Sequence, residues 1–241
     1  MGLNFAAVLG HELEADRLWE LPQVLGAARA PHLTHAIAEF DRRTNEYMMA
    51  RYQIPPRFPN VAEQAWNVSP TQLPLYRDAT GALTLVEPPA MHEELGKRGQ
   101  QIHFAPVDAW RTVGMAEWWA LEKPLEADGP AGLMLTIGPH ALDISCWLRW
   151  GIFLTEPTLL SALRYVCYEL SRVVGSPLAI YTSDTRTPID AIAEGSTIVE
   201  IVAQLRASLD TLRPILSVLD KDSALDNSDH DAYYLDTFAD L

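Results

Sequence analysis

The stretch TEPTLLSALRYVCYELSRVVG covers residues 155–175 and carries the clearest helical pattern in the chain. Its apolar residues recur at spacings of three and four, which places them on one face of an α-helix. These residues are Leu159, Leu160, Leu163, Val166, Cys167 and Leu170. Thr155 is a suitable N-cap and Gly175 a suitable C-terminal stop, so we predict a helix over 156–174.

Further elements are predicted on both sides of this helix. Downstream, residues 178–181 fit a short strand, and a last helix runs from about residue 197 to Leu212. Upstream, Leu3 to Leu9 fits a short buried strand. Thr34 to Arg51 has one apolar and one charged face, which is typical of a surface helix.

Prolines are concentrated between residues 54 and 139, which hold eleven of the seventeen in the chain. Because proline removes a backbone donor and breaks helices, this region favours short strands. We predict them at 73–76, 83–86, 102–104 and 133–137, with the first two forming a hairpin around the turn at 77–81. One helix is expected here, over 107–121.

This order of elements predicts one mixed α+β domain over residues 1–219, with a partly antiparallel sheet covered by helices. A chain of 241 residues that is 48% hydrophobic can bury a sizeable core. An acidic segment, 220–241, follows that domain.

The net charge of −14 arises from 32 acidic and 18 basic residues. Nucleic acids and anionic membranes bind clustered Lys and Arg, so we expect neither as a partner. No uncharged apolar run approaches the roughly 18 residues of a membrane span, and the N-terminus lacks the basic start of a signal peptide. Cys146 and Cys167 lie in apolar sequence and are predicted to be free thiols, with a disulfide between them as the alternative. These features predict a cytoplasmic protein.

The C-terminal segment holds seven aspartates and one lysine, so it carries −6 of the net charge. Aromatic residues are interleaved with these acids, and a purely solvated tail gains nothing from them. We therefore expect the segment to dock on the body of the protein or on a partner. The candidate binding residues are Asp229, Asp231, Tyr233, Tyr234, Asp236 and Phe238, with Trp118 and Trp119 as further anchors.

A weak catalytic pattern is present in His140 and Asp143, which would share a face if the segment were helical. Such a pair can act as a base with its orienting acid, or as two metal ligands, although a turn histidine with a capping aspartate fits equally. Asp184 follows a predicted strand, where either a catalytic acid or an N-cap belongs. A hydrolase would require these three residues to converge. No phosphate-binding, serine-elbow or HExxH motif occurs, so we predict neither a metal nor a cofactor.

Several segments together resemble a group of uncharacterised bacterial proteins of similar length. They are Gly10-His11, Ile137-Gly138-Pro139, Ala179 to Asp184 and Tyr233 to Phe238. Some small acidic bacterial proteins of this sort resemble immunity proteins that neutralise secreted toxins. This resemblance implies protein binding and transfers no catalytic residue.

The expected function is therefore that of a non-enzymatic protein-binding protein, and its specific version is an immunity or inhibitor-type protein. In that version it masks a basic toxin or nuclease with its acidic residues. The first alternative is a small hydrolase with a site around the three residues named above. The second is a structural subunit of a larger assembly, which requires an exposed apolar patch that holds tryptophans.

Overall fold

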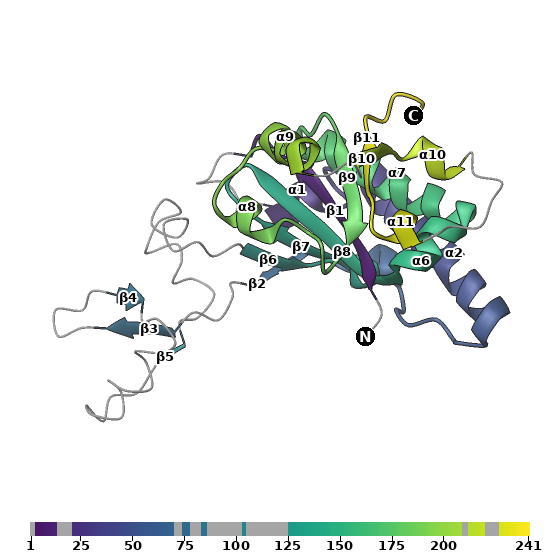
Figure 1. The fold of residues 1–241 in the computed structure, drawn as a ribbon. Coiled ribbons are helices and arrows are strands. Elements are labelled where there is room, and N and C mark those ends of the chain that lie inside the picture. Colours follow the sequence, from purple (N-terminus) through teal and green to yellow (C-terminus); the bar gives the residue numbers. More distant parts are fainter. Residues whose placement is uncertain are drawn as a thin grey trace, which may run out of the picture.

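Strand β1 (Asn4–Gly10) is an inner strand of the main sheet, and its residues from Phe5 onward are all buried. The computed structural model describes residues 3–13, 21–69, 74–77, 83–85, 103–104, 125–208, 212–219 and 227–241. Successive side chains of a strand point to opposite faces, so a strand buried along its length must be covered on both faces. Helices provide that cover (Figure 1).

Within the described residues the main sheet has eight strands, in the order β10, β11, β9, β1, β8, β7, β6, β2. Their bounds are β2 Asn67–Ser69, β6 Leu125–Asp128, β7 Met134–Ile137, β8 Ala141–Arg149, β9 Ala179–Ser183, β10 Leu212–Pro214 and β11 Tyr233–Asp236. Neighbouring strands are antiparallel except β10 and β11, which are parallel. The sheet is thus mostly antiparallel, as predicted.

A second sheet has three strands in the order β4, β3, β5. Their bounds are β3 Pro74–Arg77, β4 Leu83–Leu85 and β5 His103–Phe104. Strands β3 and β4 pair antiparallel, which confirms the predicted hairpin. The helix predicted over 107–121 lies outside the described residues.

One face of the main sheet packs against a large core to which four helices contribute. They are α1 (Leu21–Leu25), α2 (Pro31–Tyr52), α6 (Trp150–Thr155) and α7 (Pro157–Val174). Phe5, Ala7 and Leu9 of β1 point into this core, and α2 packs on α7. The short 3-10 helices η2 (Val61–Glu63) and η3 (Pro130–Gly132) lie beside α2.

The opposite face forms a smaller core with α8 (Ile189–Ala193) and α9 (Ile198–Ser208). Val8 of β1 points to this side, next to Ala141 and Ile180 from the neighbouring strands. Figure 1 shows α8 and α9 together, away from α2 and α7. With the short helices α10 (Leu216–Leu219) and α11 (Asn227–His230), these elements make a mixed α+β domain, as the sequence predicted.

Helix α7 matches the predicted helix, but its N-terminus differs by one detail. The N-cap is Glu156, without a side-chain capping bond, whereas Thr155 ends α6 and donates its hydroxyl to the Gly151 carbonyl. Pro157 starts the helix, where its missing N–H costs nothing. Gly175 has a φ of 81°, the left-handed conformation that stops a helix, so the predicted stop is confirmed.

The acidic C-terminal segment contributes an inner strand, because β11 lies between β10 and β9. The prediction that this segment docks is confirmed, and it docks on the sheet of the same protein. Arg164 of α7 holds it with an ion pair of 2.6 Å to Asp236, which also accepts a hydrogen bond from the Tyr181 hydroxyl. Phe238 packs on Tyr168 at 5.5 Å between ring centroids.

Both cysteines are buried and free, as predicted. Burial raises the pKa of the Cys146 thiol to about 12 and raises that of Cys167 as well, so both stay protonated. Among the described residues, no helix combines the length and the apolar character that crossing a bilayer demands.

Candidate functional site

The three residues of the hydrolase hypothesis do not converge. His140 precedes β8 rather than lying on a helix, and its carbonyl accepts the N–H of His11 at one end of β1. Asp184 donates its backbone N–H to Asn4 at the other end. The seven residue steps from position 4 to position 11 correspond to about 23 Å at a strand rise of roughly 3.3 Å. The expectation that His140, Asp143 and Asp184 share one pocket is therefore wrong.

Asp143 nevertheless has an unusual environment in the middle of β8. It is 4% exposed, and burial raises the pKa of its carboxyl to about 7, with the Asp184 charge adding to the increase. The nearby Thr187 hydroxyl lowers the pKa of this carboxyl and so offsets part of the increase. Its contact with the carboxyl does not meet the geometry of a hydrogen bond. Asp143 Oδ1, Thr182 Oγ1 and Thr187 Oγ1 are buried without a hydrogen-bond partner in the described part of the chain.

Asp184 has a structural role instead. The backbone N–H of Asn4 donates to its Oδ1 at 3.0 Å, and the Asn4 amide nitrogen donates to its Oδ2 at 2.9 Å. These two bonds fasten the start of β1 to the end of β9. A carboxylate that accepts two such bonds is held in place rather than available as a base.

The predicted binding residues of the C-terminal segment are engaged inside the protein. Asp229 pairs with Arg213 at 2.5 Å, Asp231 with Arg186 at 2.7 Å, and Asp236 and Asp240 with Arg164. The described aspartates of the segment are thus each matched by an arginine. Their charge is largely neutralised within the fold, and Asp229 and Asp236 are buried.

The aromatic residues of the segment are engaged in the same way. The Tyr233 hydroxyl donates to the Arg186 carbonyl, and the Tyr234 hydroxyl donates to the Asp229 carbonyl. Phe238 is buried against α7, as described above. These residues serve folding, because a buried side chain is not presented to a partner.

The tryptophans are divided between the core and the surface. Trp118 and Trp119 lie outside the described residues. Trp150 is fully buried, stacks on Phe153 at 5.3 Å and donates its ring N–H to the His230 carbonyl. Trp147 is half-buried and lines a surface pocket.

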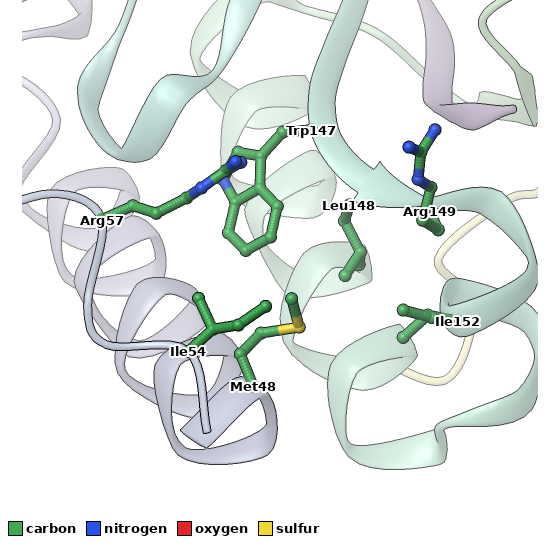
Figure 2. Close-up of a pocket in the computed structure, with 7 residues that line it drawn as sticks. All are labelled: Met48, Ile54, Arg57, Trp147, Leu148, Arg149 and Ile152. Atoms are coloured by element: carbon green, nitrogen blue, oxygen red, sulfur yellow. The ribbon is translucent and has the colours of Figure 1, made fainter. Parts of the chain in front are cut away.

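This pocket has a volume of about 200 Å³ and lies where the end of α2 approaches the ends of β8 and α6. Figure 2 shows its lining. Arg57 and Arg149 are its charged residues, Trp147 is its aromatic residue, and the remaining side chains are aliphatic or thioether. The latter are Met48, Ile54, Leu148 and Ile152. We call this the arginine–tryptophan pocket.

Two local features of the sequence create the pocket. Helix α2 ends at Tyr52. Its C-cap, Gln53, adopts a left-handed φ of 58°, and the following Pro55 and Pro56 prevent its continuation. The chain then turns so that Ile54 and Arg57 face β8. On β8 the register to β1 shifts between Asn4 and Phe5, which pair with Arg149 and Cys146, so the intervening residues bulge out of the ladder.

The two arginines are held differently. The guanidinium of Arg57 lies 4.6 Å from the centroid of the Trp147 ring, within cation–π range. Arg149 donates from Nη1 to Asn4 Oδ1 at 3.1 Å, and Figure 2 shows its guanidinium turned away from the apolar floor. Because Asp184 fixes Asn4, the position of Arg149 depends on the hydrogen bonds between Asn4 and Asp184 at the start of β1. None of the described lining residues is acidic.

An exposed apolar flank adjoins the pocket at the end of α2. Met49 is 46% exposed and Tyr52 50% exposed, and Ile54 belongs to both the flank and the pocket. Tyr52 is positioned by an edge-on contact of 6.1 Å with Tyr47. We call the pocket and this flank together the recognition surface. No sequence pattern predicts this surface, although tryptophan is a predicted type of binding anchor at Trp118 and Trp119.

The comparisons with known proteins give no further identification. No family model, no curated protein and no solved structure matches this chain. In the described ranges, no group of three or more His, Cys, Asp or Glu side chains is arranged to hold a metal ion.

Proposed function

We propose that this chain is a non-enzymatic protein-binding protein whose contacts are made by the recognition surface. The observation that carries the proposal is the exposure of Tyr52 and Met49 beside the pocket. The pocket itself presents the half-buried Trp147 and the exposed Arg57. Tryptophan, tyrosine, methionine and arginine are enriched in interfaces, and the first two with arginine dominate binding hot spots. Large apolar side chains left in water gain free energy when a partner covers them.

An inhibitor-type version of this function, in which the protein masks a basic toxin or nuclease, is a second candidate. The described C-terminal aspartates no longer support it, because arginines of the same chain pair with them. Support comes instead from α8 and α9, where Asp190, Glu194 and Glu200 are exposed. Val199, which is 64% exposed, adds an apolar contact there. A basic partner would be attracted by the net charge of −14 and by these carboxylates.

The other two hypotheses have less support. A hydrolase would have to use Asp143 without His140, and the buried carboxyl lacks a second titrating group at hydrogen-bond distance in the described part of the chain. A structural subunit would use the same exposed flank, but in a permanent contact. Permanent interfaces are larger and more hydrophobic than a flank that borders an arginine pocket.

A photo-crosslinking residue placed at position 52 or at position 199 of the full chain tests the proposal in the native host. We expect position 52 to give a discrete adduct, and the Met49→Ser/Tyr52→Ser variant to bind the purified partner at least tenfold more weakly. Loss of two exposed anchors of this kind has that magnitude. Val199→Ser is the matched control, because Val199 is exposed on the opposite side of the sheet.

The two versions predict different adducts. If only position 199 crosslinks and binding is lost in high salt, the result supports the inhibitor-type version, in which the acidic face of α8 and α9 binds the partner. Absence of an adduct at both positions overturns the protein-binding proposal.

A further inference from the structure

We infer that the arginine–tryptophan pocket binds an apolar side chain of the partner together with an adjacent carboxylate, so that the partner presents an acidic–apolar segment to it. This inference rests on the proposed protein-binding function and specifies the chemistry of its partner. The partner surface that meets the pocket is thus acidic, opposite in sign to the basic toxin of the inhibitor-type version.

The size of the pocket limits what it holds. A volume of about 200 Å³ corresponds to roughly seven water molecules at about 30 Å³ each. Pockets for drug-sized ligands start at about 300 Å³. A single large side chain with one attached polar group fits this space, whereas an extended cofactor does not.

The floor of the pocket selects for an apolar side chain. Met48, Ile54 and Ile152 surround it in Figure 2, and Leu148 closes it from β8. Water against such a floor is poorly paired, so an aliphatic group gains free energy by replacing it. Met48 adapts its flexible thioether to the shape of the group that enters.

The charge at the pocket selects for a carboxylate. A guanidinium stacked by its face on an indole keeps its N–H edges directed outward, where they can form a two-pronged bond to a carboxylate. The guanidinium carbon of Arg57 lies over the Trp147 ring, 4.6 Å from its centroid, and no described lining residue offers it an internal carboxylate. The charged residues that line the pocket are both arginines, in a chain whose net charge is −14.

The roles of the two arginines are unequal. Arg57 lies beside the ring that forms the pocket wall, while Arg149 is tied to Asn4 and turned away from the floor. Arg57 is therefore the main carboxylate-binding residue. Arg149 contributes a positive potential at the rim, which is weaker because water screens it.

The test uses two small probes that differ only at the polar group: N-acetyl-L-leucine, which carries a carboxylate, and N-acetyl-L-leucinamide, which carries a neutral amide. Each is titrated into the full chain while the indole N–H signal of Trp147 is followed by NMR. The Trp147→Phe variant assigns that signal. We expect the acid to bind about fivefold more tightly than the amide, the magnitude of one exposed ion pair.

Four variants at three arginines locate the preference. In Arg57→Gln the acid binds no better than the amide. In Arg149→Gln the preference falls by about twofold, since only a screened potential is lost. Arg51→Gln is the matched control and should leave both affinities unchanged. Arg51 is exposed at the end of α2, next to the pocket, but does not line it. Arg57→Lys keeps the charge, loses the planar stack and gives an intermediate preference.

The inference is overturned if the acid and the amide bind equally, or if Arg57→Gln keeps the preference. It is also overturned if Arg51→Gln removes the preference as fully as Arg57→Gln does. Its failure is separable from failure of the proposed function. Suppose that a partner crosslinks at position 52 and still binds after its acidic residues are replaced by Gln. That result supports the protein-binding function and refutes only the inference that the pocket binds a carboxylate.

Discussion

Replacing the buried carboxyl with an amide, in the variant Asp143→Asn, is expected to stabilise the protein at neutral and alkaline pH. Asp143 lies almost fully buried on β8 without a partner for its Oδ1. Burial raises the pKa of this carboxyl from 3.8 to about 7 in the folded protein. Ionising this carboxyl destabilises the folded state, where it is buried, but not the unfolded chain, where water solvates it.

The sign and size of the effect follow from proton linkage. Because the pKa is raised in the folded state, the contribution of Asp143 is fully favourable below about pH 4 and is lost as the pH rises to about 7. A shift of about three pH units corresponds to about 4 kcal/mol at 1.36 kcal/mol per unit. Asparagine has nearly the same shape and does not ionise, so it avoids this loss. It also brings an N–H donor to the unpartnered hydroxyl of Thr187, which neighbours this side chain.

Urea denaturation at pH 5 and pH 8 measures the effect. With a slope of about 2–3 kcal/mol per molar, a gain of 4 kcal/mol raises the midpoint of Asp143→Asn over the wild type by about 1–2 M at pH 8. The gain should be much smaller at pH 5, where the native carboxyl is already protonated. Asp190→Asn, on exposed α8, is the control and should change neither midpoint appreciably. An equal gain at both pH values would refute the linkage argument, because it would have to arise from packing alone.

Three further outcomes are expected. Arg164→Ala should lower the free energy of unfolding by about 3–5 kcal/mol, because it leaves the carboxylate of Asp236 buried without its cation. Arg42→Ala, whose partner Glu46 is exposed, should cost less than about 1 kcal/mol in the same denaturant titration. Gly138→Ala should lower the melting temperature, because a Cβ there would lie 2.0 Å from the Ile192 carbonyl oxygen and the backbone would have to move; unchanged melting would disprove the close approach. The two cysteines should not react with a water-soluble thiol reagent until the chain unfolds, and rapid labelling of the native protein would contradict their burial.

The elements with one dominant period were predictable from the sequence. Helix α7 has apolar residues at helical spacing, and β1 is a short apolar segment next to a glycine, so both were found within one or two residues. Strand β8 was missed, because its alternating Leu142, Ile144 and Leu148 run directly into the apolar helix α6. A continuous apolar run does not reveal where one period ends and the next begins.

The site residues were less accessible to prediction, since their partners are distant in sequence. The C-terminal segment was expected to dock, but nothing near Asp236 in the chain points to Arg164, 72 residues away. His140 and Asp143 look like a pair only under a helical period, and on the observed strand the pattern loses its meaning. The recognition surface joins Arg57 to Trp147 through a register shift in β8, a feature set by tertiary pairing.

The inner position of β11 sets an order of events during synthesis. This strand is the last of the eight to leave the ribosome, yet it separates β9 from β10, which are both made earlier. Until residues 233–236 emerge, β9 has a free edge on that side, and the guanidinium of Arg164 has no Asp236 to meet. A nascent chain with an open, apolar strand edge is prone to associate with other chains. We therefore expect a chain that lacks residues 233–236 to aggregate more readily than one that contains them.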